Sequence, residues 1–266
     1  MTENPKCKRH WFRYSLRSLL IFVTIVGCAL GWLGMKFREA KKQENAVRSI
    51  RKIGGIAKYD YEFSPSVGEP PNLARRVPKW LCEKMGEDLF ENIYEVDLSG
   101  HTVTDADMET LGQLVQLRRL WLDDTDVTDV GVEQIKNLHQ LEDLSLRETK
   151  VTDSGLERLK RLNALRDLDL TSTRVTDAGL EHVRGFTKLE MLWLRQTNVT
   201  DVGLACLKGL DQLQGLYLDG TRVSDAGLGN LTGLKHLDRV TLKGTRVTDA
   251  GAAKLQKELP STIIGG

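Results

Sequence analysis

Residues 151–174 read VTDSGLERLKRLNALRDLDLTSTR, and the same pattern returns every 24 residues. Each copy begins with Val-Thr-Asp or, once, Val-Ser-Asp, at positions 103, 127, 151, 175, 199, 223 and 247. The spacing never shifts, so the unit is V-T-D-x-G-L-x-x-L-x-x-L-x-x-L-x-x-L-x-L-x-x-T-x. A fixed period of about 20–50 residues predicts a solenoid, in which each unit packs on its neighbours.

Each part of the unit has a physical task. Leu168 and Leu170 alternate with polar residues as in a strand, and equivalent strands about 4.8 Å apart would form a parallel sheet on the concave side. Thr173 follows this strand, where its hydroxyl can satisfy backbone groups of a turn. Thr152 is expected to cap a convex helix, and Asp153 to complement the dipole of that helix. We assign the Asp ladder to capping, because calcium needs about six to eight oxygen ligands.

The ends of the array depart from the repeat, as expected of terminal units. His101 occupies the Thr position of the first unit. The last unit degenerates after Leu255, and Pro260 interrupts it. We expect residues 261–264 to form a final strand that covers the open end of the array.

This unit resembles the leucine-rich repeats, in the branch related to the cysteine-containing subfamily, with Thr where that subfamily has Cys. The leader Tyr14–Leu20, followed by an apolar segment, Gly54-Gly55 and Tyr59-Asp60-Tyr61, looks like that of membrane-tethered repeat proteins of planctomycete-type bacteria. The resemblance implies an α/β leucine-rich-repeat solenoid with a parallel concave sheet and short convex helices, preceded by one transmembrane helix. It also implies a binding scaffold, without naming its ligand.

The apolar segment before the repeats is the predicted anchor. Eighteen uncharged residues, Ser18 to Met35, would span roughly 27 Å as a helix, near the thickness of the hydrocarbon core of a bilayer. A core helix is the alternative. More basic residues precede the segment than follow it, which favours a cytoplasmic N-terminus and a repeat domain on the exported, periplasmic or extracytoplasmic, side. Because Ile25-Val26-Gly27-Cys28 resembles a bacterial lipobox, lipidation of Cys28 is a further alternative.

The region between the anchor and the repeats is expected to cap the first unit. Without such a cap, the hydrophobic core of the first repeat would be exposed to solvent. An amphipathic helix over 36–53 ends at Gly54-Gly55, and a short strand over 56–63 and a helix from Pro78 follow. The alternative is a ligand-binding subdomain that uses Tyr59, Asp60, Tyr61 and Trp80. The expected organisation is therefore a basic leader (1–17), a transmembrane anchor (18–35), a juxtamembrane helix and N-terminal cap (36–95), and the solenoid with its C-terminal cap (96–266).

Bulk properties and motifs argue against catalysis. A net charge of +1 indicates neither nucleic acid nor an acidic substrate. The four cysteines lie in no metal or redox motif, and no G-x-S-x-G, H-E-x-x-H, P-loop or G-x-G-x-x-G occurs. Asp169 paired with Asp143 or Asp167 is the one candidate for acid–base chemistry, but nothing in the sequence distinguishes these groups from solvated charges. We expect no enzymatic activity, no cofactor and no metal site.

The concave face is where we expect a ligand. One row of side chains lies between the two leucines, and a second row lies two residues further on. Trp193 and Tyr217, with Arg195 and Asp169 beside them, form the best anchor, because aromatic residues and arginine dominate binding hot spots. The candidate site is Trp121, Arg147, Asp169, Trp193, Arg195, Tyr217 and Asp219. The alternative is that these aromatic rings only pack on their neighbours across the sheet.

The sequence therefore predicts a membrane-tethered, non-enzymatic scaffold that binds a protein and no nucleic acid. A structural envelope protein that self-associates is the alternative. The cysteine-containing subfamily is often linked to ubiquitin-ligase substrate receptors. That role is less favoured here, because no F-box-like helical segment precedes the repeats.

Overall fold

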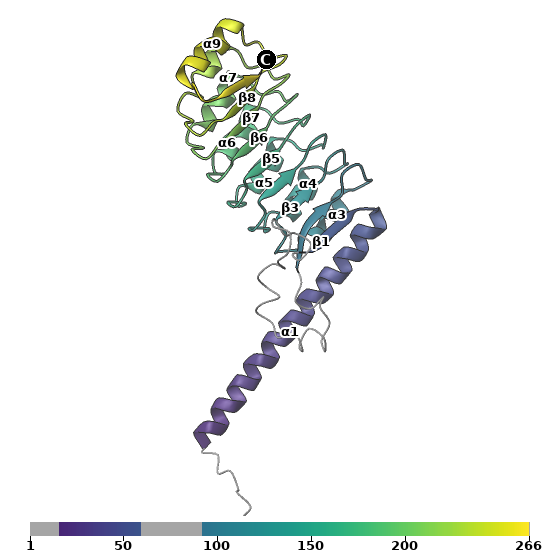
Figure 1. Cartoon of the computed structure of the whole chain (residues 1–266). Coiled ribbons are helices and arrows are strands. Elements are labelled where there is room, and N and C mark those ends of the chain that lie inside the picture. Colours follow the sequence, from purple (N-terminus) through teal and green to yellow (C-terminus); the bar gives the residue numbers. More distant parts are fainter. Residues whose placement is uncertain (1–15, 60–91, 266) are drawn as a thin grey trace, which may run out of the picture.

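The computed structural model describes residues 16–59 and 92–265. The leader, the helix expected from Pro78, and the candidates Asp60, Tyr61 and Trp80 lie outside these ranges. In the described chain, strands and helices alternate along a solenoid (Figure 1). The strands form a nine-stranded sheet whose spatial order follows the chain from β1 to β9.

The sheet is parallel from β2 onward, as predicted, and only β1 runs antiparallel to its neighbour. Each paired residue faces the residue 24 positions along, so Leu144 faces Leu168 and Leu168 faces Leu192. The 24-residue period therefore sets the register of the sheet. The strands are β1 Ile56–Tyr59, β2 Ile93–Asp97, β3 Arg119–Trp121, β4 Asp143–Ser145, β5 Asp167–Asp169, β6 Met191–Trp193, β7 Gly215–Tyr217, β8 Arg239–Thr241 and β9 Ile263–Gly265.

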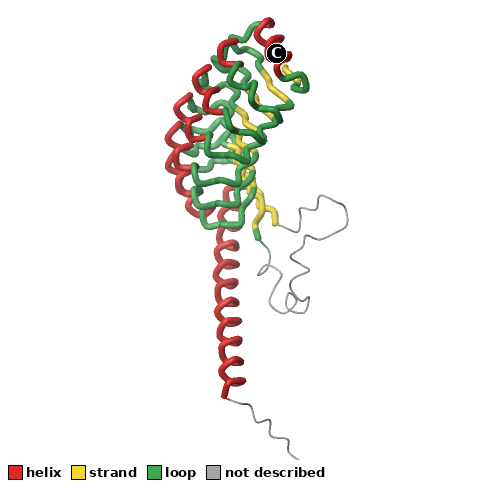
Figure 2. The backbone as a smooth tube through the Cα atoms, turned by 90° about the vertical axis from the view of Figure 1, so that its left-hand side faces the viewer, coloured by secondary structure: helices red, strands yellow, loops and turns green. Residues whose placement is uncertain are grey.

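Short helices form the opposite, convex layer, as Figure 2 shows. They are α3 Asp105–Leu111, α4 Asp129–Gln134, α5 Asp153–Leu159, α6 Asp177–Val183, α7 Asp201–Leu204, η3 Ala205–Leu207, α8 Asp225–Leu228 and α9 Asp249–Glu258. The predicted threonine N-cap is confirmed, since Thr152 Oγ1 accepts a 3.3 Å hydrogen bond from the Ser154 N–H. The helix therefore begins where the V-T-D motif places it.

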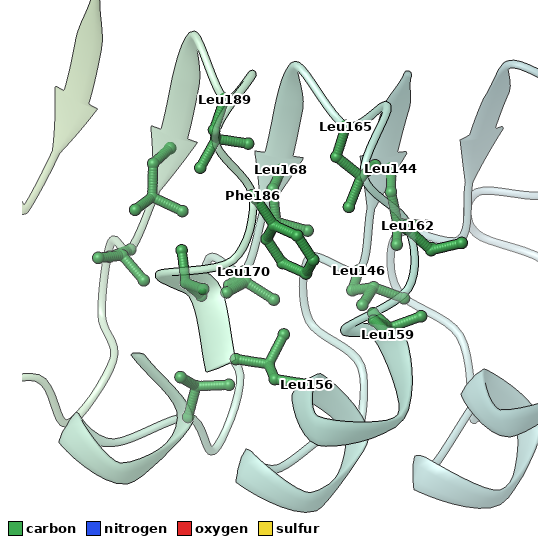
Figure 3. Close-up of a cluster of buried hydrophobic side chains, with 14 of the residues drawn as sticks. Leu144, Leu146, Leu156, Leu159, Leu162, Leu165, Leu168, Leu170, Phe186 and Leu189 are labelled. Atoms are coloured by element: carbon green, nitrogen blue, oxygen red, sulfur yellow. The ribbon is translucent and has the colours of Figure 1, made fainter. Parts of the chain in front are cut away.

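Leucines from both layers fill the space between sheet and helices. In Figure 3, Leu168 and Leu170 from one repeat meet Leu156 and Leu159 from the preceding helix. All four side chains are fully buried. Phe186, also fully buried, takes the place that Leu162 has one repeat earlier. The core is thus a stack of similar aliphatic layers.

The aspartates of the V-T-D motif connect neighbouring repeats. Asp153 accepts hydrogen bonds from both the backbone N–H and the hydroxyl of Thr176 in the next repeat, each at 2.7 Å. Six such pairs join consecutive repeats from Asp105–Thr128 to Asp225–Thr248. The dipole interpretation is therefore incomplete, because each carboxylate chiefly fixes the N-cap of the following helix.

The glycine of T-D-x-G makes room for this carboxylate. A Cβ atom on Gly179 would lie 2.4 Å from Asp153 Oδ1, far inside van der Waals contact. The first unit has no preceding repeat, and Asp107 stands at the glycine position there. Its carboxylate instead forms a capping box with Thr104. Aspartate and glycine therefore recur together because they meet across each repeat boundary.

The threonine that follows each strand closes the turn, as predicted. Thr173 Oγ1 donates to Leu170 O at 2.7 Å, and the equivalent bond recurs at Thr125, Thr149, Thr197, Thr221 and Thr245. His101 replaces threonine in the first unit, where its ring lies against Gly54. A Cβ atom on Gly54 would be 2.8 Å from His101 Cδ2. The departure at the terminal unit thus reflects its contact with the element that covers it.

That element is the end of α1, a single helix of 38 residues from Leu16 to Ile53. Ala46, Val47 and Ile50 are buried in the same core cluster as the first repeat. The helix ends as expected at Gly54, which has φ +100°, and the Gly55 N–H reaches Ile50 O at 2.9 Å. The segments predicted as anchor and as juxtamembrane helix therefore form one continuous α-helix.

The first half of α1 projects away from the repeats (Figures 1 and 2). Among the described residues, this is the one helix long and apolar enough to cross a membrane. Its most apolar 18-residue window has a mean hydropathy of 2.1 and none of it is buried. The apolar segment is therefore not a core helix of the described domain.

Candidate functional site

Strand register sets the rows of the concave face. The row between the leucines runs, in register, through Asp97, Trp121, Ser145, Asp169, Trp193, Tyr217 and Thr241. A third row, which the sequence analysis did not treat as a row, contains Glu95, Arg119, Asp143, Asp167, Met191, Gly215 and Arg239. This row could have been predicted from strand alternation alone, since residues two apart in a strand face the same side of the sheet.

Trp193 and Tyr217 meet as predicted. Their rings are parallel to within 2° and their centroids are 3.6 Å apart. Tyr217 is only 8% exposed, whereas Trp193 is partly exposed. Gly215 permits this packing, because a Cβ atom there would lie 2.7 Å from Met191 Sδ and 3.2 Å from the Tyr217 ring. Trp193 is therefore the member of the pair that a ligand can reach, while Tyr217 mainly supports it.

Arg195 lies at the edges of this stack. Its guanidinium carbon is 5.1 Å from the Trp193 centroid and 4.9 Å from the Tyr217 centroid. Nearly equal distances from two parallel rings place the cation beside both edges. Arg195 Nε is also 2.8 Å from Asp219 Oδ2, and Asp219 accepts hydrogen bonds from Thr241 Oγ1 and the Lys243 N–H. Arg195 and Asp219 are thus both held by partners within the sheet.

Two carboxylates lie on the other side of Trp193. Asp167 Oδ1 accepts a 3.1 Å hydrogen bond from the Trp193 indole N–H, and Asp169 is the register partner of Trp193. Burial, followed by the charge of Asp143, raises the pKa of Asp167 to about 6, against the opposing effect of the Trp193 bond. Within residues 16–59 and 92–265, no lysine or arginine forms an ion pair with Asp167 or Asp169.

Asp143 differs from these two, because Arg119 Nε lies 2.8 Å from its carboxylate. Burial still raises the pKa of Asp143, with Arg119 opposing the shift. Burial likewise raises the pKa of Asp123, whose carboxylate accepts a hydrogen bond from Ser145. Of the three acids considered for acid–base chemistry, Asp143 therefore has a cationic partner. Asp167 and Asp169 form no ion pair in the described chain.

The remaining candidates are further away. Trp121 lies in the same row as Trp193 but is separated from it by β4 and β5, so the two do not form one patch. Arg147 is exposed and turns to Glu148, with Nη2 2.8 Å from Oε1. Among the described residues, no group of three or more His, Cys, Asp or Glu is arranged to hold a metal ion.

Comparison with known proteins defines the class of the repeats. Residues 163–223 match the family model described as leucine rich repeat. Together with the 24-residue register of the parallel sheet, this match identifies an α/β leucine-rich-repeat solenoid. The array thus has the architecture of a protein-interaction scaffold.

The solved structures of two internalins are similar to part of this chain. Internalin C2 of Listeria monocytogenes is 25% identical, with a TM-score of 0.49, over 65% of this chain and 80% of that one. The internalin inlF of the same organism is 18% identical, with a TM-score of 0.44, over 65% of this chain and 60% of that one. No curated protein matches the sequence.

Proposed function

We propose that this protein is a membrane-tethered, non-enzymatic scaffold that binds a protein on its concave face. The observation that carries the proposal is the centre of the sheet, where a partly exposed Trp193 lies beside two carboxylates without a cation among the described residues. Solenoids offer extended concave binding surfaces, and aromatic residues and arginine dominate binding energy. The proposed surface is Trp121, Arg147, Asp169, Trp193, Arg195, Tyr217 and Asp219.

The proposed subfamily is the branch related to the cysteine-containing leucine-rich repeats, with the planctomycete-type leader as its membrane-tethered form. Six turn threonines support the first part, since each occupies the position of that cysteine and hydrogen-bonds the turn. The long α1 supports the second part. Its apolar half is not buried, and Ala46, Val47 and Ile50 near its other end pack into the same core as the first repeat.

The tether is tested by charging the apolar half of α1. A lysine at the centre of a membrane-spanning helix costs roughly 2.5–3.5 kcal/mol. The double variant Phe22→Lys/Val26→Lys should therefore leave the membrane fraction after alkaline extraction. The matched variant Glu44→Lys/Asn45→Lys, in the exposed charged part of the helix, should stay with it. External protease should remove the repeat domain from intact spheroplasts if it is exported.

Mass spectrometry of the membrane-bound chain separates the remaining alternatives. The intact mass is expected, whereas a chain that begins at a lipidated Cys28 or after the apolar segment would contradict the helical anchor. Protection of the repeat domain in spheroplasts, with cleavage only after lysis, would reverse the proposed orientation.

The concave surface is tested with a photoreactive residue. Benzoylphenylalanine in place of Arg147 on the concave face should give a discrete covalent adduct with a second protein in cells. The same residue in place of Lys160, the exposed C-cap of the convex helix α5, should give none. Loss of the Arg147–Glu148 pair costs little, because both side chains are about half exposed. Equal adducts from both positions, or none from position 147, would contradict the proposal, and an adduct of twice the chain mass would favour self-association.

A further inference from the structure

The two faces of the Trp193 ring have different surroundings. Trp193 lies on β6, between Tyr217 on β7 and Asp169 on β5. Because the ring is stacked flat on Tyr217, its other face is directed to the side of Asp169. Arg195 lies beside the edges of the stack and does not cover this outer face. No other described aromatic ring is stacked on it.

The charges around the outer face are unbalanced. Asp167 is engaged by the Trp193 indole and Asp169 by the Thr171 N–H at 2.7 Å, both of which are neutral donors. Three arginines, in β3 or next to the ends of β4 and β5, form ion pairs with other acids. Arg119 pairs with Asp143, Arg147 with Glu148, and Arg166 with Glu190. Asp167 and Asp169, on the side of this outer ring face, therefore form no ion pair with a lysine or arginine of the described chain.

We propose that the outer face of Trp193, with Asp169 and Asp167, binds an arginine side chain of the partner protein. This inference rests on the proposed function and names the partner's chemistry. A guanidinium is planar, so it stacks on an indole face while its edge N–H groups donate to carboxylates beside the ring. Cation–π contact and a charge-assisted hydrogen bond then act on one group. Arg195, already at the edges of the same two rings, shows that this stack accommodates a guanidinium nearby.

The test uses the full chain in detergent micelles, with ¹⁵N-labelled tryptophan. The probes are three blocked tripeptides, acetyl-Gly-X-Gly-amide, where X is arginine, its uncharged isostere citrulline, or lysine. The Trp193 indole N–H resonance is identified by its loss in Trp193→Phe. We expect the arginine peptide to shift this resonance and to bind at least tenfold more tightly than the citrulline peptide, with lysine weaker than arginine.

Asp169→Asn is the discriminating variant. The amide oxygen still accepts from the Thr171 N–H, so the fold is retained while the charge is lost. Arginine binding should weaken about tenfold. Asp211→Asn, the same change at an exposed site outside the strands, should leave binding unaltered. Equal binding of arginine and citrulline, or full binding by Asp169→Asn, would overturn the proposal, and equal binding of lysine would overturn the choice of a guanidinium.

The inference and the proposed function fail separately. An adduct at position 147 without any arginine preference would retain the scaffold and remove the arginine site. An arginine preference without an adduct would retain the site and remove the protein-binding role. An adduct that disappears in Asp169→Asn but persists in Asp211→Asn would support both.

Discussion

Replacing Gly179 with alanine is expected to lower the free energy of unfolding by about 2–3 kcal/mol, although alanine is the better helix former by about 1 kcal/mol. The new Cβ would lie 2.4 Å from Asp153 Oδ1, which already holds the Thr176 N–H at 2.7 Å. The carboxylate must therefore move and release the N-cap of the next helix. Urea denaturation of the full chain in detergent micelles, followed by circular dichroism, measures the effect.

Gly229→Ala is the matched control. Gly229 is the C-cap of α8 and has ordinary helical angles, and a Cβ atom there would have no atom within 4 Å beyond its chain neighbours and the backbone of its own helix. Its replacement should be neutral or stabilising by up to about 1 kcal/mol. The double variant Asp153→Ala/Gly179→Ala should lose less stability than the sum of the two single variants, because Asp153→Ala removes the oxygen with which the new Cβ clashes. Additive losses, or equal effects at Gly179 and Gly229, would show that the carboxylate does not set the glycine position.

Framework positions of this fold are readable in the sequence because each has a local task. Thr173 closes its own turn and Thr152 caps its own helix, so the residue type and its place in the unit were sufficient. The partnership of Asp153 and Gly179 was not readable in this way. Their contact crosses a repeat boundary, and periodicity shows only that both residues recur.

The candidate surface was predictable as rows and not as contacts. Register follows from the 24-residue period, so the neighbours Trp193 and Tyr217 could be named. The burial of Tyr217 depends on Gly215, which lies in the row that was not considered and admits Met191. Which carboxylates remain without an ion pair depends on the acid with which each arginine pairs. That choice is made by side-chain rotamers among several nearby acids, and a single sequence does not reveal it.

The continuous α1 illustrates a signal that was present. No proline or glycine separates Met35 from Gly54, so nothing ends a helix between the apolar segment and the charged one. The two segments differ in composition, but the backbone hydrogen bonding of a helix does not depend on that change, and α1 continues through it. The repeat array is therefore joined to the apolar segment by an uninterrupted helix.

Phe186→Ala is expected to lower the free energy of unfolding by about 3–5 kcal/mol, the largest loss among these variants. Phe186 is fully buried, and leucine occupies the equivalent place in the neighbouring repeats, at Leu162 and Leu210. Val183, also fully buried and three residues before it, stands where those repeats have Leu159 and Leu207. A larger side chain at one position thus accompanies a smaller one at the other, which conserves core volume.

This compensation predicts coupling between the two positions. Phe186→Leu should cost about 1–1.5 kcal/mol through the space it leaves, and Val183→Leu alone about 1–3 kcal/mol through overpacking. The double variant restores the leucine pair of the adjacent repeats and should be close to the parent in denaturation midpoint. Simple additivity would mean that the two side chains do not share one cavity, and equal losses for Phe186→Ala and Phe186→Leu would mean that the ring fills no space of its own. Because the repeats share one backbone period, we expect both the native Val–Phe pair and a Leu–Leu pair to be stable at positions 183 and 186. Each single variant, which combines one member of each pair, should be less stable.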